Sequence, residues 1–206
     1  LPFRVEAPKV DETAIPGEAP AARALRLAHA KAMAISLRHP QAWVLGSDQV
    51  ADCAGRIHDK PGDAAHCREQ LRASSGRAVQ FLTAVVLRRL RSEAVREHVD
   101  RTVVHFRPLD DGEIARYVER DQPFDCAGGF RCEGLGVALF EAVETRDPSA
   151  LIGLPLIWVA QSLREAGLDP EEVRKDLASE RDVAEVEAEA ARANQAGISG
   201  VPFFIF

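Results

Sequence analysis

The stretch "VLGSDQVADCAGRIHDKP", residues 44–61, joins an apolar run to two charged side chains. The run stops at Gly46 and is followed by an acid, Asp48, and further along by a lysine, Lys60. Its Val-rich composition predicts a buried strand over residues 42–51. We therefore expect this strand to end on a carboxylate, with a lysine nearby.

Strand and helix patterns alternate on both sides of this stretch. Residues 1–20 read as a short strand followed by an acidic, proline-rich loop. Apolar side chains recur at helical spacing over residues 21–38, and Pro40 ends that helix. Asp63 is expected to cap a helix that ends near Gly76, and two Val- and Phe-rich runs after it predict strands.

The second half of the chain continues the alternation. Asp110 and Glu113 have the spacing of a capping box at the start of a helix. A glycine-rich loop over residues 126–136 precedes an expected strand at 137–144 and a last helical region over 147–167. Strands that alternate with helices in this way predict an α/β fold with one main sheet.

Composition and charge limit the class of protein. The chain has 206 residues, of which 46% are hydrophobic and 28% are charged, as in ordinary globular domains. Its net charge of −6 argues against nucleic-acid binding, which needs clustered Lys and Arg. No apolar run reaches membrane-spanning length, and no signal-peptide pattern is seen, so we expect a cytoplasmic protein with no membrane partner.

The cysteines indicate reduced thiols. The chain contains four, Cys53, Cys67, Cys126 and Cys132, and none of them forms a C-x-x-C pair. Their spacing fits neither a zinc site nor a disulfide framework. His66, His98 and His105 do not cluster in sequence either, so we expect no histidine metal site.

The composition changes at Asp169. Residues 171–194 are acidic and alanine-rich, and "GISGVPFFIF" at the end reads as a turn and a buried strand. We place a domain boundary here, with a main domain over residues 1–168 and a short helix–strand appendage over 169–206.

Four charged residues stand out in the main domain: Glu12, Lys31, Asp48 and Lys60. Taken singly, each has an ordinary structural explanation. Glu12 fits a solvated loop, Lys31 a helix face, Asp48 a turn cap and Lys60 an exposed surface.

They lie in the first four of seven motifs that occur in one order: "APKVDET", "LRLAHAKA", "GSDQV", "DKP", "QLRASSGR", "CAGGFRCEGLG" and "RDPSALIGLPL". In order and distance these motifs resemble the Maf family of nucleotide pyrophosphatases, over about residues 1–168. "GSDQV" and "FRCEGLG" resemble the branch of that family that acts on 7-methyl-GTP. The resemblance implies an α/β fold of the Maf and ITPase type, with a mixed sheet flanked by helices and a central cleft.

The resemblance also implies a reaction. A nucleoside triphosphate is hydrolysed between its α and β phosphates, which gives a monophosphate and pyrophosphate. By resemblance, Asp48 accepts the proton of the attacking water and Glu12 is a ligand of a divalent cation, magnesium or manganese. Lys31 and Lys60 would bind the phosphates.

Selection of the base is assigned to Gln49 and Glu133. The N1–H and N2–H groups of 7-methylguanine are donors, and a carboxylate accepts such hydrogen bonds. The alternative for Glu133 is a plain loop acid beside glycines. Those glycines, such as Gly128 and Gly136, either form turns or let the backbone approach the ligand.

One family feature has no counterpart in this chain. The resemblance implies a Ser-x-Ser-x-Arg-Arg segment ahead of the matched motifs, and the sequence contains none. We therefore expect a main domain that is truncated at its amino terminus and lacks one strand and part of the phosphate site. A catalytically impaired nucleotide-binding module is the alternative to an active enzyme.

The appendage resembles a different family. "LASERDVAEVEAEAARANQAGISGVPFFIF" is similar to the C-terminal part of FrnE-like thiol oxidoreductases of the DsbA family, with Pro202 at the position of their cis-proline. A DsbA-like oxidoreductase is thus a further alternative function, although its chemistry needs a C-x-x-C dithiol that this chain lacks. A redox-inactive remnant of a gene fusion is preferred over a plain helix and strand that dock on the main domain.

The partner expected from all these features is a small-molecule nucleotide. Nucleic acid and membrane are not expected as partners, and a homodimer is left open.

Overall fold

The computed structural model describes residues 3–168 and 204–205. Along the chain these residues form α1 (Pro20–Ser36), β1 (Val44–Cys53), β2 (Arg56–His58), α2 (Ala64–Ser74), β3 (Ala78–Arg89), β4 (Ala94–Phe106), α3 (Asp111–Asp121), β5 (Phe140–Glu144), α4 (Leu156–Glu165) and β6 (Phe204–Ile205). Short 3-10 turns lie between them: η1 (Leu90–Ser92), η2 (Ala127–Gly129), η3 (Leu135–Leu139) and η4 (Pro148–Ile152).

The strands form one sheet in the order β2-β1-β3-β4-β5, with β6 also paired to β1. The predicted α/β class is confirmed. The expected mixed sheet needs one correction, because every strand pairing that the structure describes is antiparallel. Short reversals explain two of these pairs, since Ala54-Gly55 joins β1 to β2 and the η1 turn joins β3 to β4.

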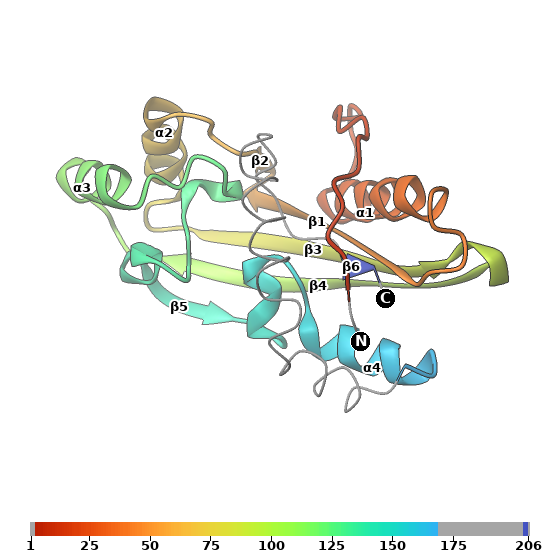
Figure 1. Cartoon of the computed structure of the whole chain (residues 1–206). Helices are drawn as coiled ribbons and strands as arrows, with labels where there is room; N and C mark the ends of the chain where they lie inside the picture. Colours follow the sequence, from red (N-terminus) through yellow and green to blue (C-terminus); the bar gives the residue numbers. More distant parts are fainter. Residues whose placement is uncertain (1–2, 169–203, 206) are drawn as a thin grey trace.

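Helices cover both faces of the sheet (Figure 1). One face of β1 and β3 packs on α1, and the opposite face packs on α4 at the same end of the sheet. At the other end, α2 and α3 lie side by side and enclose a third apolar cluster with β3 and β4. The three clusters leave the middle of β1 between them.

Asp48 lies in the middle of β1, so the expectation that the strand ends on this carboxylate is wrong. Gly46 and Ser47 do not break the strand; both serve close packing. An added Cβ at Gly46 would lie 2.7 Å from the carbonyl oxygen of Ala28 and 2.7 Å from the amide nitrogen of Ala32, both on α1. The Ser47 hydroxyl donates to the carbonyl oxygens of Ala84 and Gly153.

Replacing Gly46 with alanine should therefore destabilise the fold by roughly 1–3 kcal/mol or more, because α1 would have to move off the sheet. A thermal melt followed by circular dichroism measures this effect. Gly112→Ala on α3 is the matched control, since the nearest atom to its added Cβ would be 3.1 Å away, against 2.7 Å at Gly46. Equal melting temperatures for the two variants would contradict the close packing of α1 on β1.

Both predicted helix caps are confirmed. Asp63 accepts a hydrogen bond from the amide of His66, and Asp110 with Glu113 forms the capping box of α3. The strand expected near the amino terminus is wrong, because the described part of residues 3–19 contains only an isolated bridge at Arg4. The strand expected at 137–144 begins only at Phe140, since the preceding residues form η3.

The strand of the appendage is present as β6, which pairs with Val44 and Leu45 of β1. The helix expected over 171–194 and Pro202 lie outside the described residues. None of the described helices is long and apolar enough to cross a bilayer.

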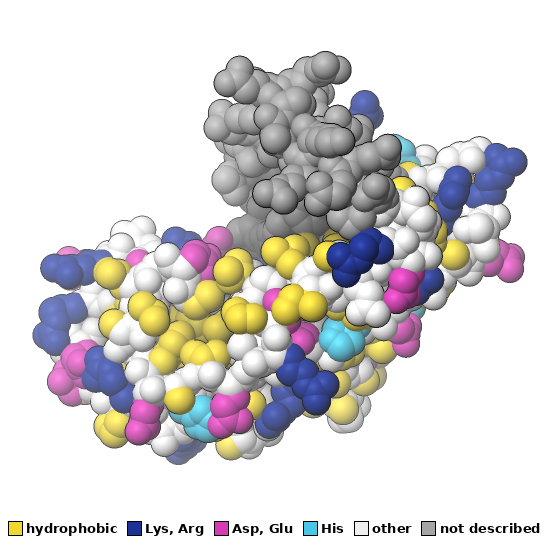
Figure 2. All heavy atoms as spheres, turned by 90° about the horizontal axis from the view of Figure 1, so that it is seen from below, with side chains coloured by type: hydrophobic (Ala, Val, Ile, Leu, Met, Phe, Trp, Pro, Cys, Tyr) yellow, Lys and Arg dark blue, Asp and Glu magenta, His cyan; other side chains and the backbone are white. Residues whose placement is uncertain are grey.

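The underside of the molecule carries exposed apolar side chains. Figure 2 looks at the molecule from below and shows hydrophobic side chains gathered on this face. Large exposed hydrophobic side chains of β5, α4 and the neighbouring turns are Leu135, Val137, Val143, Ile152, Leu156 and Ile157.

Candidate active site

A cleft of about 520 Å³ opens at the middle of β1. It is lined by side chains from both faces of the sheet: Glu12, Arg23, Leu27, Lys31, Asp48, Gln49, Val50, His58, Asp59, Lys60, Phe81, Asp125, Cys126, Ala127, Phe130, Arg131, Cys132, Glu133, Leu151 and Ile152.

All the residues assigned to the site from sequence line this cleft: Glu12, Lys31, Asp48, Gln49, Lys60 and Glu133. They come from segments up to 121 positions apart, since Glu12 precedes α1 and Glu133 follows η2. The fold therefore brings the predicted residues together, and their individual roles stay predictions.

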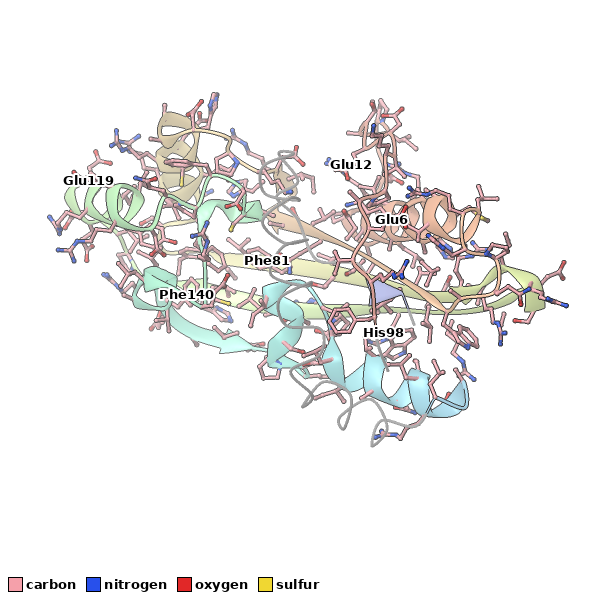
Figure 3. All side chains as sticks on the ribbon, viewed as in Figure 1. Glu6, Glu12, Phe81, His98, Glu119 and Phe140 are labelled. Atoms are coloured by element: carbon pink, nitrogen blue, oxygen red, sulfur yellow. The ribbon has the colours of Figure 1, made fainter. Side chains whose placement is uncertain are left out.

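Lys31 is held between two carboxylates. Its ammonium Nζ lies 2.6 Å from Oδ1 of Asp48 and 2.9 Å from Oε1 of Glu12. Asp48 and Lys31 are nearly buried, each with 12% of the side chain exposed, whereas Glu12 is 55% exposed. Figure 3 shows Glu12 on the irregular segment beside α1 and Phe81 within the sheet. The buried pair is therefore approached by a third, solvent-facing charge.

Burial raises the pKa of Asp48, and the nearby Glu12 charge acts in the same direction. The attraction of Lys31 opposes this shift without cancelling it. Burial lowers the pKa of Lys31, but the two carboxylates outweigh burial and its pKa is raised. The two directions suit different roles, because Asp48 becomes a stronger base than an ordinary aspartate while Lys31 stays charged.

Gln49 projects from the opposite face of β1. Its amide nitrogen donates to Oγ1 of Thr83 at 2.9 Å and to the carbonyl oxygens of Ala150 and Leu151 at 3.0 and 3.2 Å. The side chain thus holds η4 against the sheet. With its donors engaged, Gln49 offers a ligand its carbonyl oxygen, which accepts hydrogen bonds.

Asp48 and Gln49 are consecutive residues, and side chains of a strand alternate between faces. Asp48 meets Lys31 of α1 on one face, and Gln49 meets η4 on the other. Because both line the cleft, the cleft passes along the edge of β1 that faces away from β3.

The Gln49 side of the cleft has an aromatic wall. Phe81 and Phe130 line it with ring centroids 5.3 Å apart in an edge-to-face arrangement. Phe130 continues the contact to Phe106 and Phe140 behind it. An apolar, rigid wall of this kind suits a planar base better than it suits phosphate.

The glycine-rich loop carries Arg131 and Glu133 at the rim. Arg131 donates to Oδ1 of Asp125 at 3.0 Å, and Glu133 is exposed. The glycines of this loop are required by packing: Gly128 has φ 77°, and an added Cβ at Gly136 would lie 2.3 Å from the carbonyl oxygen of Arg131. Local structure thus requires glycine at both positions, and an approach of this backbone to a ligand stays a prediction.

The thiols in the cleft are not nucleophiles at neutral pH. Burial raises the pKa of Cys126 to about 11 and that of Cys132 to about 11. A thiolate is the reactive form, so neither side chain supports thiol chemistry here.

Sequence reasoning missed Arg23, His58 and Asp59 in the cleft. The signal for Arg23 was its spacing, since Arg23, Leu27 and Lys31 recur every four residues on one helix face. His58 is 2% exposed, and burial lowers its pKa, so the ring is neutral. Nothing in the sequence distinguished Asp59 from a surface acid.

The Asp48 end of the cleft offers carboxylate oxygens, the donor type that hard divalent cations take, and both carboxylates are engaged by Lys31 in this structure. The carboxylates of Glu12 and Asp48 converge on one point, the Lys31 ammonium. In the described residues, no group of three or more His, Cys, Asp or Glu side chains is arranged for a metal ion. A magnesium-type site needs only one or two carboxylates when substrate phosphates and water supply the other ligands.

Comparisons with known proteins agree with this geometry. The family described as "Maf-like protein" matches residues 1–166, and the family described as "DSBA-like thioredoxin domain" matches residues 156–206. A 7-methyl-GTP pyrophosphatase of Xanthomonas campestris pv. campestris (strain 8004) is 51% identical over 167 residues, which is 81% of this chain and 86% of the relative.

Two further relatives carry the same name. The protein of Chromohalobacter salexigens is 49% identical over 172 residues, or 82% of this chain and 88% of the relative. The protein of Thiobacillus denitrificans is 47% identical over 169 residues, which is 82% of this chain and 84% of the relative.

Proposed function

Because the chain belongs to the family of Maf-like proteins, we propose that it is a nucleotide pyrophosphatase that hydrolyses 7-methyl-GTP to 7-methyl-GMP and pyrophosphate. The observation that carries the proposal is the convergence of Glu12, Lys31 and Asp48 at one end of a cleft that has an aromatic wall at its other side. The first end suits a triphosphate, and the second suits a base.

In this proposal Asp48 removes a proton from the water that attacks the α-phosphorus. Its raised pKa increases its proton affinity, and the hydrogen bond from Lys31 fixes the orientation of its carboxylate. Lys31 and Lys60 are the positive charges that face the phosphates. The leaving pyrophosphate gains negative charge as the bond breaks, so fixed cations accelerate the step.

Of the two carboxylates at this end of the cleft, Glu12 is the residue that would hold a divalent cation, magnesium or manganese, because Asp48 is the proposed base. When bound, that cation would neutralise phosphate charge and lower the pKa of the attacking water. Glu12 is the better placed to bind it, since its carboxylate is 55% exposed and can turn toward an incoming ion.

Base selection falls to Glu133 and Gln49 in this proposal. Glu133 is exposed, so the desolvation that sharpens selectivity has to come from the bound base itself. Two donors on the guanine edge satisfy the carboxylate, whereas uracil and thymine offer one.

The test is the catalytic efficiency for 7-methyl-GTP, UTP and dTTP, measured side by side with product identification. We expect 7-methyl-GTP to be preferred, and Glu133→Gln to reduce that preference roughly tenfold, the scale of one hydrogen bond to a charged group. Glu141→Gln, at an exposed position on β5 outside the cleft, is the control. A preference for UTP or dTTP in the unmutated chain would refute the assignment.

The appendage has no redox role in this proposal. The DSBA-like match covers residues 156–206, and the chain has no C-x-x-C pair to supply a dithiol. We place the domain boundary near residue 169, just after the end of the Maf-like match at residue 166. A cytoplasmic location also stays a prediction.

A further inference from the structure

Arg23 occupies the cleft two helical turns before Lys31. With a rise of about 1.5 Å per residue, the two Cα atoms lie roughly 12 Å apart along α1. Asp48 is at the Lys31 end. Arg23 is instead beside the segment that follows β2, where it meets Asp59, next to Lys60.

The contact between Arg23 and Asp59 is replaceable. Nη2 of Arg23 lies 2.9 Å from Oδ1 of Asp59, and the side chains are 15% and 67% exposed. The Nε atom of Arg23 is buried with no acceptor among the described residues. A single bond to an exposed carboxylate leaves most of the guanidinium donors unused, and such exposed pairs contribute little to stability.

The two sides of the cleft define how the substrate is oriented in the proposed mechanism. The attacked α-phosphorus belongs near Asp48, and the base belongs at Phe81 and Phe130 on the other face of β1. The remaining phosphates then extend toward Arg23 and Lys60. The phosphates then stay on the α1 side of β1, and the base lies on the Gln49 side.

We propose that Arg23 binds the β and γ phosphates of the substrate, exchanging the Asp59 carboxylate for phosphate oxygens, and that it is the specific site for the leaving pyrophosphate. This inference rests on the function proposed above. Hydrolysis forms a bond between the water oxygen and the α-phosphorus and breaks the bond from that phosphorus to the bridging oxygen. The water proton passes to Asp48, and the bonding electron pair leaves with pyrophosphate, whose added charge the planar guanidinium fork accommodates.

The charges of the cleft explain why binding of the triphosphate needs the basic side chain of Arg23 in addition to the lysines. Its lining has five carboxylates, Glu12, Asp48, Asp59, Asp125 and Glu133, against four basic side chains, Arg23, Lys31, Lys60 and Arg131. Arg131 pairs with Asp125, and Lys31 pairs with the nearly buried carboxylate of Asp48; the proposal leaves both pairs in place. Asp59, in contrast, is exposed on a short loop and can release its partner to a triphosphate.

The test compares the binding of inorganic pyrophosphate and of 7-methyl-GMP by calorimetry, at one fixed magnesium concentration. Arg23→Ala should weaken pyrophosphate binding roughly tenfold to hundredfold, the range for a charged hydrogen bond, and leave 7-methyl-GMP binding unchanged. Arg23→Lys should recover part of the loss. Asp59→Asn should keep or improve pyrophosphate binding, because it removes the competing carboxylate.

Arg56→Ala is the matched control, since Arg56 makes an equivalent 2.9 Å contact with Glu69 outside the cleft. Unchanged pyrophosphate binding in Arg23→Ala would overturn the inference. An equal loss of pyrophosphate binding in Arg23→Ala and in Asp59→Asn would also overturn it, because the ion pair would then have a purely structural role. An equal loss of pyrophosphate and 7-methyl-GMP binding in Arg23→Ala would also overturn it. Failure of the unmutated chain to hydrolyse 7-methyl-GTP, in contrast, refutes the proposed function.

Discussion

Replacing Asp48 with asparagine should lower the turnover of 7-methyl-GTP by at least ~100-fold, the usual scale for loss of a general base. Asparagine keeps the shape of the side chain and still accepts a hydrogen bond from Lys31. It cannot take the proton of water. Product formation under saturating substrate measures the effect.

Asp52→Asn is the control for this variant, because Asp52 lies on the same strand outside the cleft lining and an amide oxygen can still accept from the amide of Gly55. Turnover close to normal in Asp48→Asn would mean that another group is the base. Binding of 7-methyl-GMP should survive in the variant, which separates a chemical defect from a folding defect.

The pH profile of the unmutated chain gives an independent check on the base. A general base must be deprotonated, so activity falls as the pH drops through its pKa. Because burial raises the pKa of Asp48 above 3.8, the acid limb of kcat/KM should lie above that of an ordinary aspartate. An acid limb at or below pH 3.8 would contradict the assignment.

Removal of divalent cations should abolish hydrolysis, and magnesium or manganese should restore it. The carboxylates of Glu12 and Asp48 repel a triphosphate unless a cation intervenes, and Lys31 alone is already shared between them. Turnover before and after exhaustive chelation measures the dependence. Activity that survives chelation would rule out the cation in the proposed mechanism.

Glu12→Gln tests which residue holds the cation. We expect the manganese concentration for half-maximal activity to rise roughly tenfold, as for the loss of one charged contact, and manganese affinity measured by calorimetry to fall in step. Asp11→Asn is the control, because Asp11 adjoins Glu12 but does not line the cleft. Identical metal requirements in both variants would exclude Glu12 as a ligand.

Helices and their caps were predicted well, because hydrophobic spacing and capping residues are local features of the sequence. The helical spacing over residues 21–38 corresponds to α1 at Pro20–Ser36, and the caps at Asp63 and Asp110 form as expected. Gly46 was misread because its role depends on which helix packs against it, and no local pattern carries that information. Two of the antiparallel pairs, β1–β2 and β3–β4, follow from short turns, whereas β1–β3, β4–β5 and β1–β6 join strands that are far apart in the sequence.

The site was predicted only through the order of the motifs. Nothing in the spacing of Glu12, Asp48 and Glu133 shows that they meet, since three separate parts of the fold bring them together. Gln49 was assigned to base selection, and strand alternation sends its side chain to the face of β1 opposite Asp48, on the side of the aromatic wall.

The outer edge of β1 affects how substitutions in the cleft can change ligand binding. Among the described strands, β6 pairs with Val44–Leu45 and β2 with Ala51–Cys53, so the main chain between them has no strand partner on that side. Asp48, Gln49 and Val50 of this stretch line the cleft, so main-chain donors and acceptors lie close to it, and these depend on no side chain. A substitution in the cleft can therefore change the side-chain contacts while it leaves these main-chain groups in place.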